Sequence, residues 1–171
     1  EAERSPPNVL LYVIDGGGAD LMSAYGYARE TTPFLASLAQ EGVLFWEART
    51  TAAWTKPSTA SFMTSLHHSV LGGFTTNEDR IPDQAATMAQ HFGQAGYRTG
   101  VFTSNPFSGS MSGLDRGVDH FRDKGAHPVS TSSVELHGEF LAWEAEAEGP
   151  WWAHIQTTDV AVFKNGKWTK L

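Results

Sequence analysis

The feature that most constrains this 171-residue chain is an apolar run near its start that ends in a carboxylate and a glycine loop. The run covers residues 8–14 (NVLLYVI) and is typical of a strand buried on both faces of a parallel sheet. Asp15 follows it, and then come three glycines at residues 16–18. Because ligands of open α/β sheets bind beyond the carboxyl ends of the strands, Asp15 is a candidate site residue.

Further strands alternate with helices along the chain. Apolar patterns and capping signals predict strands over residues 43–49, 98–103 and 150–158, and helices over 32–40, 57–66, 84–95 and 133–147. This alternation predicts an α/β fold, a mostly parallel sheet flanked by helices.

Three segments differ in character. Residues 1–7 form a polar leader, and residues 8–160 carry the α/β pattern. Residues 161–171 are atypical, and Asn165-Gly166 favours the turn of a hairpin there. The strand at 150–158 ends in a second carboxylate, Asp159.

Composition excludes several functions. The net charge is −7 without a basic cluster, so nucleic acid is not an expected partner. Cysteine is absent, which excludes disulfides, thiolate metal sites and a cysteine nucleophile. No apolar run is long enough to span a membrane. An export signal removed before Glu1 would place the chain in the periplasm or outside the cell; otherwise it is cytoplasmic.

The segment at residues 54–67 (WTKPSTASFMTSLH) carries the candidate nucleophile, Thr55. A helix beginning at Pro57 would present free N–H groups and its dipole to an anion. Lys56 adds positive charge, and Ser58 and Thr59 add hydrogen-bond donors. A threonine hydroxyl needs a metal or a base to become a nucleophile. The alternative is that Thr55 only caps an ordinary helix.

Asp15 is the candidate metal ligand, since an oxygen ligand at a strand end suits Ca²⁺, Mg²⁺ or Zn²⁺. The alternative is a carboxylate that caps the glycine turn. The glycine run lacks the GxGxxG spacing of dinucleotide sites. None of the seven histidines has a tight metal-binding spacing, and His154, within a strand pattern, is interpreted as a structural histidine.

Five blocks, taken in order, resemble the sulfatase N-terminal domain of the alkaline phosphatase superfamily. They are residues 7–27, 31–50, 54–67, 96–121 and 139–159, and the third resembles the family's nucleophile motif, C/S-x-P-S-R. The resemblance covers residues 8–160. It implies an α/β fold that hydrolyses sulfate or phosphate esters through a covalent intermediate.

The resemblance also implies roles for individual residues. Asp15 would be a ligand of a divalent metal (Ca, Mn or Zn), and Thr55 would be the nucleophile. Lys56 and the N–H groups after Pro57 would stabilise developing charge. Ser58, Thr59 and Asn105 would bind the substrate, a small-molecule or glycan ester.

Departures from the family pattern refine these expectations. Thr55 stands where sulfatases convert Cys or Ser to formylglycine, so no formylglycine is expected; a threonine there resembles the phosphodiesterase and phosphonate-cleaving branches. Thr59 replaces an arginine, Gly16 a second aspartate, and Ala161 stands near an expected histidine. Family domains are about twice as long or more, so the remaining part of the domain is an expected partner that completes the metal site.

Two other functions stay open. In the first, the chain would be a degenerate, non-catalytic relative that binds an anionic ligand or a partner protein. In the second, it would be a flavodoxin-like nucleotide-binding domain. The second alternative leaves the block around Thr55 unexplained.

Overall fold

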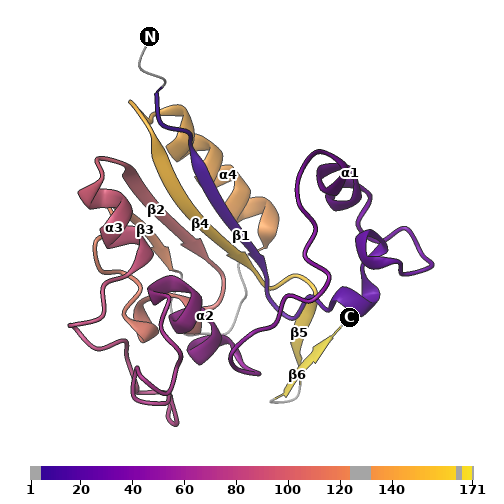
Figure 1. Ribbon diagram of the computed structural model, residues 1–171, viewed down its shortest axis with the longest axis horizontal. Helices are drawn as coiled ribbons and strands as arrows, with labels where there is room; N and C mark the ends of the chain where they lie inside the picture. The colour runs from indigo at the N-terminus through magenta and orange to yellow at the C-terminus, as the bar shows by residue number, and fades with distance from the viewer. Residues whose placement is uncertain (1–4, 124–131, 165–166, 171) are drawn as a thin grey trace. The chain divides into compact units, whose positions relative to one another are not determined.

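The computed structural model describes residues 5–123, 132–164 and 167–170, and for residues 161–170 it describes the backbone only. The chain divides into two compact units: Glu1–Asp15 with Thr51–Leu171, and Gly16–Thr50. The first unit contains a four-stranded sheet with helices on both faces (Figure 1).

The sheet is parallel throughout, as the alternation of elements predicts. Its order is β1-β4-β2-β3, where β1 is Val9–Ile14, β4 Trp151–Thr157, β2 Arg98–Thr103 and β3 His120–Asp123. All seven residues of β4 are buried, because it lies between two strands and under helices on both sides. The strand predicted at residues 98–103 is confirmed.

Two apolar cores lie on opposite faces of the sheet. Trp152 and Val101 pack with residues of α2 (Thr55–Thr64) and α3 (Met88–Gln94). The other face packs against α4 (Ser133–Ala145), with a core of Phe102, Leu136, Phe140, Trp143, Trp151, Ala153 and Ile155. Successive strand residues alternate between the faces, so the adjacent Trp151 and Trp152 each serve one core.

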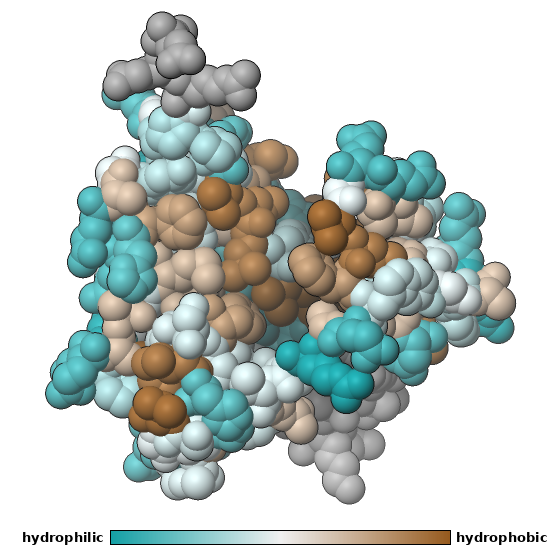
Figure 2. Space-filling view, viewed as in Figure 1, coloured by the Kyte–Doolittle hydropathy of each residue, from teal (hydrophilic) through white to brown (hydrophobic). Residues whose placement is uncertain are grey.

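The prediction that the run at residues 8–14 is buried on both faces is wrong. Strand β1 is an edge strand of the described sheet. Its second and fourth residues are exposed, and the other four are half-buried. Leu10 is 47% exposed and Tyr12 is 40% exposed. Figure 2 accordingly shows hydrophobic atoms at the surface in the region of this strand. The apolar character of the run did not reveal its place in the strand order.

The second unit, Gly16–Thr50, contains α1 (Pro33–Glu41) and two short 3₁₀ turns, η1 (Ala19–Leu21) and η2 (Ser23–Tyr25). The strand predicted at residues 43–49 is not formed. Val43 is 78% exposed there, and Trp46 packs edge-on against Tyr25 at 5.7 Å. An apolar run becomes a strand only where a partner strand accepts its backbone hydrogen bonds, and this unit contains none.

Side-chain capping marks the starts of α3 and α4. Helix α3 begins at Met88, later than predicted, because Thr87 and Gln90 form a reciprocal capping box. Strand β3, which the sequence analysis missed, is only four residues long and polar in sequence. Near the end of the chain, β5 (Ala161–Lys164) pairs antiparallel with β6 (Lys167–Lys170). The predicted turn at residues 165–166 lies outside the described residues.

None of the helices in the described parts of the chain has the length and apolar character that crossing a bilayer requires.

A pair of glycine substitutions tests the packing on the α4 face. A Cβ at Gly100 would lie 2.9 Å from Phe102 Cε2 and 3.0 Å from Trp143 Cζ2. We expect Gly100→Ala to lower the free energy of unfolding by about 1–3 kcal/mol. In the matched control, Gly138→Ala, the new Cβ meets nothing within 4 Å in α4, and stability should rise by about 0.5–1 kcal/mol. Urea unfolding followed by tryptophan fluorescence measures both, and an unchanged Gly100→Ala midpoint would contradict the packing described.

Candidate active site

Four polar side chains meet at the carboxyl edge of the sheet, and we call them the strand-end cluster: Asp15, Thr55, Asn105 and Gln156. Asp15 Oδ2 accepts hydrogen bonds from the other three, at 2.9 Å from Gln156 Nε2, 2.5 Å from Asn105 Nδ2 and 3.1 Å from Thr55 Oγ1. Asn105 Nδ2 also lies 3.3 Å from Thr55 Oγ1. These contacts fix the carboxylate and hold the hydroxyl against it.

The sheet topology produces this meeting. Strand β4 pairs Thr157 with Ile14 of β1 and Gln156 with Thr103 of β2, so the carboxyl ends of three strands coincide. Asp15 directly follows β1, and its N–H donates to Thr157 O at 2.9 Å. The cluster therefore belongs wholly to the first unit and joins residues up to 141 positions apart.

Thr55 is the first residue of α2, and the interpretation that it caps this helix is wrong. The N-cap is Trp54, in extended conformation, and the Thr55 hydroxyl is directed to Asp15 instead. The helix begins two residues earlier than predicted, so the Ser58 N–H after Pro57 already bonds to Trp54 O at 3.3 Å. Helix geometry leaves the N–H groups of the first two residues without an intrahelical acceptor, beside the Thr55 hydroxyl.

Asn105 is held in one orientation by the turn that follows β2. Its Oδ1 accepts the Phe107 N–H at 2.9 Å and caps the 3₁₀ turn η3 (Pro106–Ser108). The amide nitrogen therefore faces Asp15, and the side chain is only 7% exposed. Its predicted contact with substrate stays a prediction, since the contacts seen are with Asp15 and Thr55.

Gln156 is the member of the cluster that the sequence analysis missed. It lies on the central strand, is 1% exposed and donates through Nε2 to Asp15. Its Oε1 is buried and has no hydrogen-bond partner in the described residues. A glutamine near the carboxyl end of the predicted strand at residues 150–158 was the signal available in the sequence.

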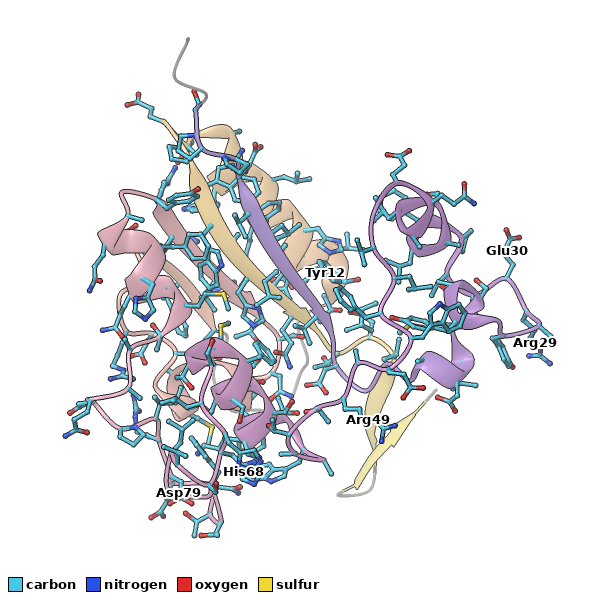
Figure 3. The ribbon with its side chains drawn as sticks, in the orientation of Figure 1. Tyr12, Arg29, Glu30, Arg49, His68 and Asp79 are labelled. Carbon is cyan, nitrogen blue, oxygen red and sulfur yellow. The ribbon has the colours of Figure 1, made fainter. Side chains whose placement is uncertain are left out.

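Lys56 is not brought to the strand-end cluster. Its side chain is fully buried, and Nζ donates to Asn77 O at 2.5 Å. Burial lowers the pKa of the Lys56 ammonium, whereas the nearby carboxylate of Asp79, labelled in Figure 3, raises it. The ammonium thus supports the loop around residues 77–80, and its catalytic role stays a prediction.

The other two predicted contact residues lie further along the same helix. Ser58 is half-buried, and Thr59 is 1% exposed, so little of Thr59 is accessible from solvent. Their roles in substrate binding also stay predictions. The carboxylate of Asp159 accepts the Ser133 N–H at 3.1 Å, at the start of α4, and therefore serves that helix.

His154 lies two residues before Gln156 on β4 and is fully buried, as a structural histidine would be. The Phe62 ring of α2 meets it edge-on at 6.1 Å. Burial lowers the pKa of the imidazole to about 4, although the Leu11 backbone and the Gln156 side chain lie near enough to raise it slightly. Neither ring nitrogen has a partner at hydrogen-bonding geometry in the described residues, and with a pKa of about 4 the ring is neutral at neutral pH.

Oxygen atoms make the strand-end cluster suited to one side of a hard divalent cation site. The Asp15 carboxylate and the Thr55 hydroxyl are the natural ligands. In the part of the chain that the structure describes, no group of three His, Asp or Glu side chains could hold a metal ion. A cation bound here would therefore need further ligands beyond those two.

The sheet is parallel, and a carboxylate and a hydroxyl at the start of a helix lie at its carboxyl edge. These features are typical of α/β domains that bind ligands at that edge. A family model described as Sulfatase matches residues 7–148. The chain belongs to this family, which confirms both the resemblance and the predicted fold class.

Curated relatives are sulfatases of greater length. The N-acetylgalactosamine-6-O-sulfatase of Bacteroides thetaiotaomicron is 34% identical over 99 residues, covering 56% of this chain and 19% of that protein. The human N-sulphoglucosamine sulphohydrolase is 33% identical over 140 residues, covering 80% of this chain and 25% of that protein. The match thus spans a quarter or less of these relatives.

Solved structures agree on the fold. The phosphonate monoester hydrolase of Agrobacterium radiobacter superposes with a TM-score of 0.73 at 24% identity, covering 90% of this chain and 41% of that one. BT4656, solved with its substrate D-glucosamine-2-N,6-O-disulfate, superposes with a TM-score of 0.74 at 21% identity, covering 88% and 34%.

The buried imidazole predicts acid sensitivity. The folded-state pKa of His154, about 4, lies below the ordinary value of 6.5, so the unfolded chain binds the proton first as the pH falls. The contribution to stability is complete above about pH 6.5 and is lost between about pH 6.5 and 4, by at most about 3 kcal/mol. Urea unfolding at several pH values should show this loss in the wild type and a flatter profile in His154→Leu. Parallel profiles for the two proteins would contradict it.

Proposed function

We propose that this chain is part of a metal-dependent hydrolase of sulfate or phosphate esters in which Thr55 is the nucleophile. The observation that carries the proposal is the 3.1 Å contact between Thr55 Oγ1 and Asp15 Oδ2 at the first residue of α2. Relatives named as sulfatases and the fold shared with a phosphonate monoester hydrolase support ester hydrolysis.

In the proposed reaction, Thr55 Oγ1 forms a bond to the phosphorus or sulfur atom while the bond to the ester oxygen breaks. The Thr55 hydroxyl releases its proton as it attacks, and the leaving alkoxide takes up one proton and departs as the alcohol, so the number of protons is unchanged. Water then cleaves the bond to Thr55, releases phosphate or sulfate and restores the hydroxyl. Thr55 carries a β-methyl group, so the intermediate forms on the hydroxyl itself and requires no formylglycine.

Each residue of the strand-end cluster has its own role in the proposed reaction. Asp15 orients the Thr55 hydroxyl, and Asn105 Nδ2, 3.3 Å from Oγ1, offers a donor to an oxygen that gains charge there. The start of α2 favours the anionic substrate group. When bound, a divalent cation (Ca, Mn or Zn) held by Asp15 and Thr55 would lower the pKa of the hydroxyl.

The substrate would be a small-molecule or glycan ester, in keeping with the relatives named for amino-sugar sulfates. The remaining metal ligands and the acid for the leaving group would come from a further segment of the domain. The compartment stays a prediction.

One observation favours a second function. Among the described residues, Asp15 is the sole carboxylate in the strand-end cluster, and no three-residue metal group exists. A degenerate module that binds an anion at the start of α2 without turnover would need no more than this.

Hydrolysis assays separate the two functions. p-Nitrophenyl sulfate, phosphate and phosphonate esters would be assayed with Ca²⁺, Mn²⁺ or Zn²⁺, in this chain and in the longest protein that carries it. We expect Thr55→Ala to lower kcat/KM at least about 10³-fold, because the attacking oxygen is lost, while Thr55→Ser retains turnover.

The matched control is Thr64→Ala, at the other end of α2, where the hydroxyl donates to Ala60 O and accepts the Leu66 N–H, both outside the strand-end cluster. Turnover should survive this change. Metal-dependent turnover that persists in Thr55→Ala would exclude Thr55 as the nucleophile. Absence of turnover in every form, with anion binding retained, would favour the non-catalytic module.

A further inference from the structure

Three buried polar atoms beneath the strand-end cluster lack partners among the described residues. They are Nδ1 and Nε2 of His154 and Oε1 of Gln156, on side chains that are 0% and 1% exposed. Buried polar atoms are almost always hydrogen-bonded, so unsatisfied atoms on two neighbouring side chains call for a physical reason.

The two side chains are neighbours on one face of one strand. They stand two positions apart on β4, and side chains at that spacing point to the same side of the sheet. In the register of the sheet, His154 is flanked by Leu11 on β1 and Val101 on β2, and the Phe62 ring packs over it from α2. The polar groups that raise the pKa of the ring against the effect of burial are the Leu11 backbone and the Gln156 side chain.

Their hydrogen-bonding capacities are complementary. A neutral imidazole has one N–H donor, and an amide oxygen is an acceptor. Gln156 has committed its donor end to Asp15, which leaves its acceptor end facing the protein interior. One N–H···O bond from His154 to Gln156 would satisfy an atom of each residue.

Asn105 shows what such a bond does in this site. Its Oδ1 is fixed by the Phe107 N–H, and this contact turns its amide nitrogen toward Asp15. Gln156 presents its own nitrogen to the same oxygen of Asp15. A reversed Gln156 amide would set Oε1 against the carboxylate, and two acceptors repel.

We propose that His154 is a positioning residue, which donates a hydrogen bond to Gln156 Oε1 and thereby keeps Gln156 Nε2 on Asp15. The interaction chain runs from the interior to the site: His154 orients Gln156, Gln156 orients Asp15, and Asp15 orients the Thr55 hydroxyl. The catalytic consequence rests on the function proposed above, whereas the hydrogen bond itself does not.

The first test detects the hydrogen bond between His154 and Gln156 by a measurement that does not depend on enzymatic activity. In ¹⁵N-labelled protein, NMR of the imidazole and side-chain amide groups should show His154 as a single neutral tautomer and one Gln156 amide environment. His154→Leu should shift or broaden the Gln156 amide signals, and His154→Asn, which restores an N–H donor, should return them. Phe62→Leu is the packing control, because it loosens the same pocket and leaves the donor in place. A mixed tautomer, or Gln156 signals unmoved in His154→Leu, would overturn the proposal.

The second test measures how His154 affects metal binding and turnover at the strand-end cluster. In the longest protein that carries this chain, with Mn²⁺ alone as the probe, His154→Leu should weaken binding about 10–100-fold, the range found when a group that orients a metal ligand is lost. The same loss should appear in kcat with KM little changed, and His154→Asn should recover most of it. In a Gln156→Met background, His154→Leu should add no further loss, since the two residues act as one unit. Additive losses would mean that His154 acts through packing and would overturn the inference.

The two proposals fail separately. If Thr55 proves dispensable for turnover but the Gln156 signals respond to His154→Leu, the positioning bond stands and the proposed nucleophile falls. If Thr55 is essential and the Gln156 signals ignore His154, the positioning role falls and the proposed function stands.

Discussion

The parallel pairing of β4 with β1 on one side and β2 on the other is the interaction on which the rest of the structure depends. It buries β4 completely and lets Trp151 and Trp152 anchor the two cores on opposite faces. The same pairing aligns the carboxyl ends of three strands. Stability and the candidate site therefore share one cause, and a change that shifts the register of β4 would disturb both.

The sequence predicted elements where the determining interactions are local. The strand at residues 98–103 and the helix starting at Ser133 were found because apolar runs and N-caps act within a few positions. Predictions from the sequence were wrong for features that depend on residues distant along the chain. Whether residues 8–14 form a central or an edge strand is decided by the order of strands, and the run at residues 43–49 has no partner strand in its unit.

The sequence likewise predicted only part of the candidate site. Asp15 and Thr55 were singled out because a strand end and a helix start leave recognisable signals, and Asn105 was named from the family resemblance; all three lie together in one cluster. The direction of a long side chain leaves no such signal. Lys56 follows Thr55 directly yet reaches Asn77, and Gln156 is hidden in an apolar strand yet reaches Asp15.

The donors around Asp15 bear on how a cation would be held there. Among the described residues, Oδ2 receives three hydrogen bonds, whereas Thr55 Oγ1 approaches Oδ1 at a longer distance of 3.5 Å. The two amides can therefore keep Oδ2 while Oδ1 remains available to a ligand, which makes them orienting groups more than competitors. A cluster with a single carboxylate compensates less of a divalent charge than one with two. The affinity for a cation bound there would then depend on ligands outside the cluster.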